Sequence, residues 1–508
     1  MMEPATLSRV KFSVPIQKPL SAAFTTLVLL LGSGCADEPV PATGPFEPDT
    51  GTSDAAHDAD PSPPDDASAD AVVDPGNSTP RAPTTWVVHI ADNEVDGVGW
   101  AADDVVGYLR AMGREVSRSS ALEPQCVSGS GAVLFGPDIS PDHPAQTYSI
   151  QEARCGDGTV ITLSGAGLLG RQYAAYELMH IMGVRFFHPE QEYIPREPVW
   201  HNAPISRLHT PDFQARSVSL HLTHPLELGD TFRAGIEELE PEGVRYIDWQ
   251  LKNLASAGQG GIGTGENQTR GLVRGFPSDT GMSLHSQQQG GRAVYDPDDP
   301  RPLEEQLAEA IEARMQASPS PPDRLGLTFN PSEFTELDDE FVVRELTFIA
   351  NYVADHYPET ELYAINHGTA GEPTPNYGVR YYDLPQFAPP NLGVRVHTLM
   401  FFDLFRPAPV YGNRDFNHLF SFMAQEYQKR NLIYFPEAAW WLTFDIAVPL
   451  YLPITIEARD VDIQGIKYML GGKLVGHRTF GTGHEWGYWQ NEYCSLRMAA
   501  DVDYRYTD

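Results

Sequence analysis

The sequence predicts an α/β protein in which a disordered acidic tether precedes a small α/β domain and a (β/α)₈ barrel of the TIM type. Three observations lead to this prediction. Residues 36–83 offer almost nothing to bury, residues 84–205 alternate apolar runs with helical patterns, and residues 206–508 repeat that alternation over the length of a barrel. Residues 1–35 form a fourth, separate segment.

Residues 1–35 are typical of the signal peptide of an exported lipoprotein. A basic segment ending at Lys18 precedes the apolar run 22–31, which is shorter than the roughly 20 residues of a membrane-spanning helix. Small residues then precede Cys35. We expect Cys35 to carry the lipid that anchors the protein to the cell envelope, at the outer membrane or cell surface. An ordinary secretory signal is the alternative.

Residues 36–83 are predicted to be a disordered linker. They consist mostly of Ala, Asp, Pro, Ser, Thr and Gly, and Arg81 is their one basic residue. Such a segment cannot bury enough apolar surface to offset the entropy of ordering its backbone. The linker carries part of the formal net charge of −34, and the rest of the chain is also acidic, which argues against a nucleic-acid partner.

The four cysteines fit an exported protein. Cys126 and Cys155 are close enough in sequence to form a disulfide in an oxidising compartment. Cys35 is assigned to lipidation, so Cys494 is left over, and we expect it to be buried and inert.

Strands and helices alternate in the first domain. The expected strands are 85–90, 132–135 and 159–163, and the expected helices are 97–112 and 171–182. Between the third strand and the second helix lies Gly165-Ala166-Gly167-Leu168-Leu169-Gly170, which matches the glycine pattern of dinucleotide-binding sites. No acidic residue follows at the next strand to hold a ribose, so we interpret the glycines as allowing the helix to pack closely on its sheet.

The same stretch resembles a known architecture. Residues 170–178 and 183–189 are similar to the small α/β domain that precedes the barrel in α-glucuronidases and β-hexosaminidases, and in a group of uncharacterised secreted bacterial lipoproteins. In those families, residues 211–216 would mark the entry to the barrel. The resemblance covers most of residues 84–490 and implies a glycoside hydrolase fold.

The barrel elements are expected from their patterns alone. The strands are placed at 217–222, 260–263, 282–285, 325–329, 361–365, 394–402, 432–435 and 474–476, of which the second and third are indistinct. The clearest helices are placed at 246–257, 302–315, 339–356 and 415–429.

Carboxylates follow several of these strands, at the end where barrel active sites form. Glu333 follows strand four, Asp403 follows strand six and Glu437 follows strand seven. Glycoside hydrolysis needs one protonated acid and one ionised base or nucleophile. The resemblance to α-glucuronidases implies that Glu333 is the acid and that Asp403 or Glu437 activates water. Each carboxylate alone could instead be a cap, a surface charge or an arginine partner.

Aromatic and histidine side chains near the late strands suggest a sugar ligand, because indole faces stack on sugar rings. The candidate substrate-binding residues are His221, His367, Trp440, Trp441, His477, His484, Glu485 and Trp486. His397 is a further candidate for binding hydroxyl groups. A zinc peptidase is excluded, because Tyr488 stands where a second metal-binding histidine would follow His484.

Two functions remain. The first is a surface-tethered glycoside hydrolase that acts on oligo- or polysaccharides by carboxylate acid/base catalysis and needs no metal or organic cofactor. The second is a non-catalytic, glycan-binding surface lipoprotein with a degenerate barrel. Retained carboxylates at three strand ends favour the enzyme.

Overall fold

A computed structural model of the protein describes residues 81–92, 94–120, 126–220, 246–256, 266–285, 294–317, 320–437, 455–471, 474–481 and 489–505. The predicted signal segment, Cys35 and almost all of the predicted linker lie outside these residues. Within the described part of the chain, no helix is long and apolar enough to cross a bilayer.

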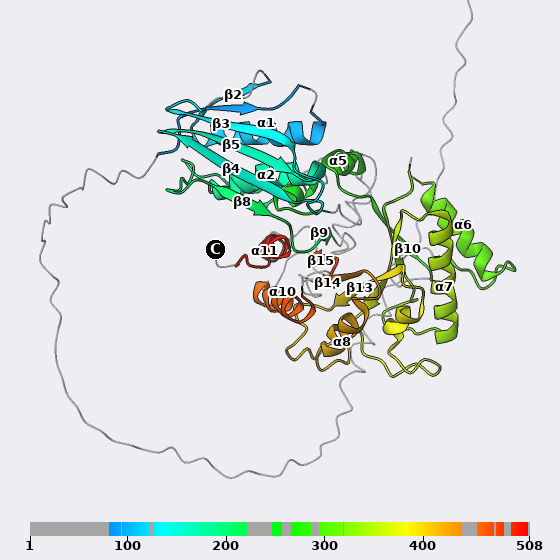
Figure 1. The fold of residues 1–508 in the computed structure, drawn as a ribbon. Coiled ribbons are helices and arrows are strands. Elements are labelled where there is room, and N and C mark those ends of the chain that lie inside the picture. Colours follow the sequence, from blue (N-terminus) through cyan, green and yellow to red (C-terminus); the bar gives the residue numbers. More distant parts are fainter. Residues whose placement is uncertain are drawn as a thin grey trace, which may run out of the picture. The chain divides into compact units, whose positions relative to one another are not determined.

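The first domain is built on a six-stranded mixed sheet with the strand order β2-β1-β3-β5-β4-β8 (Figure 1). Its strands are β1 (Thr85–His89), β2 (Glu115–Ser119), β3 (Ser130–Asp138), β4 (Tyr148–Cys155), β5 (Gly158–Gly165) and β8 (Ser206–His209). Strands β2, β1, β3 and β5 are parallel, whereas β4 pairs antiparallel with β5 and β8. The remaining elements are α1 (Asp96–Ala111), α2 (Gly167–Ile181), β6 (Arg185–His188) and β7 (Gln191–Tyr193).

The glycines at the end of β5 do allow α2 to approach the sheet closely. A Cβ atom at Gly165 would lie 2.1 Å from the carbonyl carbon of Gly170, and one at Gly170 would lie 2.4 Å from the carbonyl oxygen of Thr147. Neither position has room for a side chain. This packing is the role that we expected for the glycines in place of nucleotide binding.

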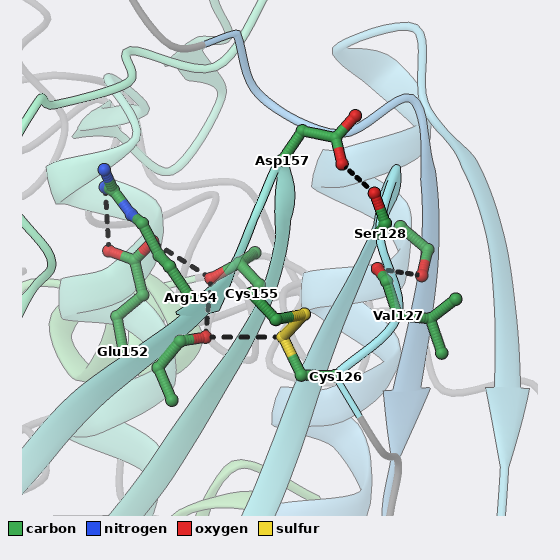
Figure 2. Close-up of a disulfide and its surroundings, with 10 residues drawn as sticks. Cys126, Val127, Ser128, Glu152, Arg154, Cys155 and Asp157 are labelled. Atoms are coloured by element: carbon green, nitrogen blue, oxygen red, sulfur yellow. Dashed lines mark hydrogen bonds and ion pairs between the residues drawn. A yellow bond between two sulfur atoms is a disulfide. The ribbon is translucent and has the colours of Figure 1, made fainter.

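Cys126 and Cys155 form a disulfide, with their Cα atoms 6.0 Å apart (Figure 2). The bond ties the segment before β3 to the end of β4. Beside it, the hydroxyl of Ser128 donates a hydrogen bond to the carboxylate of Asp157. Cys494 is free and buried, and burial raises the pKa of its thiol to about 12.

The second domain contains a curled sheet of seven parallel strands in the order β10-β11-β12-β13-β14-β15-β9. Its strands are β9 (Ala215–Leu220), β10 (Asp279–Ser283), β11 (Arg324–Thr328), β12 (Glu361–His367), β13 (Leu392–Thr398), β14 (Leu432–Pro436) and β15 (Gly476–Gly481). The last strand, β15, pairs in parallel with the first, β9. That pairing curls the sheet back on itself, as a (β/α) barrel requires.

The predicted α/β class and the predicted two-domain architecture are confirmed. Seven of the eight expected barrel strands correspond to observed strands, and the expected strand at 260–263 lies outside the described residues. The two edge strands of the described sheet are β9 and β10. In the sequence, residues 260–263 lie between these two strands.

The described barrel helices include α5 (Glu266–Arg274), α6 (Leu303–Met315), α7 (Asp339–His356), α8 (Asn417–Glu426), α10 (Ile456–Leu470) and α11 (Trp489–Ala500). A 3₁₀ helix, η1 (Tyr381–Phe387), follows β12. Helix α7 has the bounds that the sequence predicted, and its start is capped by Asp338, which accepts a hydrogen bond from the Phe341 amide at 2.9 Å. Apolar residues of α6 and α7 pack against β10, β11 and β12 in one buried cluster.

Candidate active site

The candidate site lies at the carboxyl ends of strands β11 to β14, the rim where barrels place their chemistry. Glu333 is in the loop after β11, and Glu437 follows β14 directly. His367 is the last residue of β12, and His397 is on β13, where its backbone is in register with that of His367. Four polar side chains from four neighbouring strands therefore face one region.

Glu437 is held by several partners. Its Oε1 lies 3.3 Å from Nε2 of His397, and its Oε2 accepts a hydrogen bond from the Met400 amide. Its carbonyl oxygen accepts a hydrogen bond from the guanidinium of the fully buried Arg459 at 3.2 Å. Both carboxylate oxygens thus have a fixed direction, as a base or nucleophile needs.

The hydrogen bonds of His397 define where its protons are. Its Nδ1 lies 2.8 Å from the carbonyl oxygen of Phe435. A carbonyl only accepts, so Nδ1 must carry a proton. The Nε2 atom is on the side of the Glu437 carboxylate, 3.3 Å from its Oε1. The hydrogen bond through Nδ1 therefore orients the ring toward Glu437.

Glu333 is half-buried and electrostatically connected to this pair. Burial raises the pKa of Glu333, and the negative charge of Glu437 raises it further. His397 and a hydrogen bond from Tyr411 lower the pKa of Glu333, but they do not outweigh the two raising effects. Glu333 and Glu437 are thus close enough to interact, and Glu333 keeps its proton to a higher pH than an exposed glutamate does.

The backbone around Glu333 is fixed by hydrogen bonds. The hydroxyl of Tyr382, in η1, donates to the carbonyl oxygen of Glu333 at 3.3 Å. The side-chain amide of Asn330 donates to the carbonyl oxygen of Ser332 at 2.7 Å. The short turn after β11 therefore presents Glu333 in a defined position.

Backbone strain marks the same place. Four non-glycine residues of the described part of the chain have positive φ, and two of them, Met400 (φ 57°) and Tyr411 (φ 50°), belong to this site. Met400 donates its amide to Glu437, and Tyr411 donates its hydroxyl to Glu333. Left-handed conformations of such residues cost free energy and are concentrated at functional sites. Here each of the two strained residues holds one carboxylate.

His367 is a neutral neighbour of the charged groups. Burial lowers its pKa well below the usual range, and the charge of His397 lowers it further. Its Nδ1 lies 2.6 Å from the hydroxyl of Thr369, and its ring centre lies 5.2 Å from that of His397. His367 can therefore offer a hydrogen bond to a ligand without adding charge.

Asp403 has a different environment from the two glutamates. Its Oδ1 accepts hydrogen bonds from the amides of Phe405 and Arg406, both at 2.8 Å, and its Oδ2 contacts the Arg406 guanidinium. Burial opposes ionisation, but these hydrogen bonds outweigh it and lower the pKa of Asp403. Its carboxylate caps a turn, which was the alternative to a chemical role.

The structure also separates His477 from the site. His477 is buried beside Phe213 and Tyr434, and burial lowers its pKa to about 3. On a strand, residues three apart point to opposite faces, so His477 points away from Phe480, whose ring contacts His397. The prediction that His477 binds substrate is therefore corrected. The other predicted substrate-binding residues lie outside the described part of the chain, namely His221, Trp440, Trp441, His484, Glu485 and Trp486.

Three contributors to the site were not predicted from the sequence: Met400, Tyr411 and Tyr382. Met400 acts through its backbone amide, which no residue pattern reveals. The two tyrosines come from loops whose course depends on the folded barrel. Neither tyrosine directly follows a predicted strand, so no sequence signal pointed to them.

Comparisons with known proteins support the architecture. No family model and no curated protein matches the sequence. Among solved structures, a GH138 enzyme targeting pectin rhamnogalacturonan II is similar with a TM-score of 0.54 and 11% identity over 83% of this chain. BtGH115A, a GH115 4-O-methyl-α-glucuronidase with specificity for decorated arabinogalactans, is similar with a TM-score of 0.53 and 11% identity, also over 83% of this chain.

The chain spans only 64% and 57% of the lengths of these two enzymes. At this level of identity the likeness concerns the fold. The glycoside-hydrolase-like architecture expected from the sequence is thus confirmed, with a sheet domain in front of a curled parallel barrel sheet.

Proposed function

We propose that the protein is a glycoside hydrolase in which Glu333 is the general acid and Glu437 is the general base or nucleophile. The observation that carries this proposal is the electrostatic contact between the two glutamates, which raises the pKa of Glu333 while His397 and the Met400 amide hold Glu437. A pair of carboxyl groups with opposite protonation states is what hydrolysis of a glycosidic bond needs.

The proposed reaction uses each group in turn. Protonated Glu333 gives its proton to the glycosidic oxygen as the C–O bond breaks and the bonding electrons move to that oxygen. Glu437 either attacks the sugar carbon or removes a proton from the attacking water. His397 beside Oε1 and the Met400 amide on Oε2 keep the Glu437 carboxylate oriented between turnovers.

Asp403 is not assigned to this reaction. Its carboxylate accepts hydrogen bonds from Arg406 and from two backbone amides, so its position is explained by the turn that it caps. Between the two partners that the sequence left open for Glu333, the contacts favour Glu437.

The substrate class is an oligo- or polysaccharide. The two similar enzymes are described as targeting rhamnogalacturonan II and as specific for decorated arabinogalactans, so these polymers are the first glycans to test. We further propose that the protein is exported and tethered to the cell envelope through a lipid on Cys35, with residues 36–83 as the spacer. Metabolic labelling with palmitate should mark the wild type and not Cys35→Ala.

The direct test is to incubate the full chain with both polymers and with a panel of aryl glycosides, and to measure sugar release. We expect Glu333→Gln and Glu437→Gln each to slow release by about 100-fold or more, because each removes a group that acts in the transition state. Glu309→Gln, whose side chain is 67% exposed on α6, is the matched control. Binding of a polymer without release of sugar by the wild type would support the glycan-binding alternative instead.

A further inference from the structure

One large apolar side chain beside the proposed acid faces the solvent. Phe334 follows Glu333 directly and is 62% exposed, whereas most aromatic residues near the site are buried. Its ring stacks on that of Tyr411, with the ring centres 5.2 Å apart and the planes inclined by 22°. Tyr411 therefore covers one face of Phe334, and the remaining surface of the ring is open.

The position of Phe334 is fixed by its turn. The Phe334 amide donates a hydrogen bond to the hydroxyl of Ser332 at 3.4 Å, and that hydroxyl also lies 2.7 Å from the hydroxyl of Thr335. Ser332 and Thr335 form an antiparallel bridge across the turn. The backbone that carries Phe334 is thus restrained although its side chain is exposed.

Tyr411 is restrained as well. Its carbonyl oxygen accepts a hydrogen bond from the Ala370 amide at 3.1 Å, and its ring lies edge-on to that of His367 with centres 6.1 Å apart. Its hydroxyl donates to Glu333. The rings of His367, Tyr411 and Phe334 therefore form a continuous aromatic surface that leads from the strand ends past the acid to the solvent.

We propose that Phe334, supported from behind by Tyr411, is the stacking surface for the sugar on the leaving-group side of the scissile bond. The inference rests on the proposed role of Glu333. A general acid protonates the leaving oxygen, so the leaving group must lie beside that acid. An exposed ring next to the acid offers the C–H face of a sugar a favourable apolar contact.

This placement narrows the substrate class. The ring would contribute little to binding a substrate that ends at a small leaving group. It would contribute most where a sugar with an apolar face continues the chain beyond the cleaved bond. The protein should therefore prefer glycans with at least one sugar on each side of that bond.

The binding test uses the Glu333→Gln chain, so that the glycan stays intact, and measures retardation in gels containing rhamnogalacturonan II or decorated arabinogalactan. We expect the added substitution Phe334→Ala to weaken binding by roughly three- to tenfold and Phe334→Trp to restore it. Tyr468→Ala, which removes a 91% exposed aromatic ring from α10, should leave the retardation unchanged. Equal retardation with and without Phe334, or no retardation by either polymer, would overturn the subsite.

The kinetic test separates stacking from an indirect effect on the acid. In an otherwise wild-type chain, Phe334→Ala should raise KM for an oligosaccharide more than it lowers kcat, and it should leave the basic limb of the pH profile in place. A lower kcat with a shifted basic limb would mean that Phe334 only positions Glu333. If Glu333→Gln keeps full turnover, the proposed function fails, whereas the gel result still decides whether Phe334 binds glycan.

Discussion

The imidazole of His397 lies beside the carboxylate of Glu437. The Nε2 atom of His397 lies 3.3 Å from Oε1 of Glu437, and the opposite ring nitrogen donates to the carbonyl oxygen of Phe435 at 2.8 Å. Because a carbonyl oxygen only accepts, Nδ1 carries a proton, and the ring is oriented with Nε2 toward the carboxylate. The carboxyl groups near His397 are those of Glu437 and Glu333, and the pKa of the neighbouring His367 is lowered well below its usual range.

Substituting His397 should therefore change the pH dependence of turnover. His397 lowers the pKa of Glu333, so His397→Ala should let that pKa rise. We expect kcat to fall by about tenfold or more through loss of Glu437 orientation, and the basic limb of the profile to move to higher pH. The pH dependence of kcat/KM for wild type and variant checks this, and an unmoved basic limb would contradict it.

The raised pKa of Glu333 also affects stability. When folding raises the pKa of a glutamate, its contribution to stability is fully present below the unfolded pKa of about 4.3. That contribution is lost as the pH rises through the pKa of the folded state. Glu333→Gln should therefore raise the Tm at pH 7 relative to wild type by about 1 °C or more, and should have little effect near pH 4. Thermal unfolding at the two pH values measures the difference.

Asp403→Asn is the control variant, because folding shifts the pKa of Asp403 in the opposite direction to that of Glu333. Its pKa is lowered in the folded state, so its contribution is present above the unfolded pKa of about 3.9 and is lost as the pH falls. Asp403→Asn should lower the Tm at pH 7. If Glu333→Gln and Asp403→Asn shift the Tm in the same direction at pH 7, the assignment of their environments is wrong.

The fold could be predicted because its signals are local. Apolar runs identified most strands, and the helical pattern of apolar residues predicted 339–356, which are the observed bounds of α7. Strand β10 was indistinct because Asp279-Thr280-Gly281-Met282-Ser283 is not an apolar run. Its Asp279 pairs with Arg395 and Arg478 from other strands, a partnership that no local pattern reveals.

Only part of the site could be predicted, because several of its contacts join residues that are distant in the sequence. Glu333 and Glu437 were proposed from their positions after parallel strands, whose carboxyl ends meet at one rim. The choice between Asp403 and Glu437 needed their partners, since Asp403 is occupied by Arg406 three residues later. His477 was misplaced because strand register decides which face a side chain takes, and a shift of one residue reverses it.

Arg459 should be essential to the stability of the rim. It is fully buried in α10, donates to the carbonyl oxygens of Glu437 and Phe402, and lies 3.2 Å from Asp462. Arg459→Met would leave a buried carboxylate and two carbonyls without their cation, which should lower the free energy of unfolding by about 3 kcal/mol. Chemical denaturation measures this.

The matched control for Arg459 is Arg505→Met. Arg505 pairs with Asp460, which lies on α10 as Arg459 does, but the Arg505 side chain is 45% exposed. An exposed pair contributes at most about 1 kcal/mol, so this variant should unfold close to wild type. Equal losses in the two variants would contradict the role given to Arg459.

The disulfide should stabilise the first domain. It closes a loop between residues 29 positions apart, so Cys126→Ser with Cys155→Ser should lower the free energy of unfolding by about 3 kcal/mol. Reducing agent should destabilise the wild type and leave the double variant unchanged. If reducing agent lowered the free energy of unfolding of the double variant as much as that of the wild type, the destabilisation would not come from this disulfide.

The most direct test of the account is the titration of the Glu333 carboxyl group in wild type and in Glu437→Gln. It can be followed by carbon-13 NMR of selectively labelled glutamate and assigned by the signal that Glu333→Gln removes. We predict that Glu333 titrates above the usual value of about 4.3 in the wild type and at a lower pH in Glu437→Gln, because the neighbouring charge is gone. Titration of Glu333 at the same, ordinary pH in both proteins would show that the two carboxylates do not share one site.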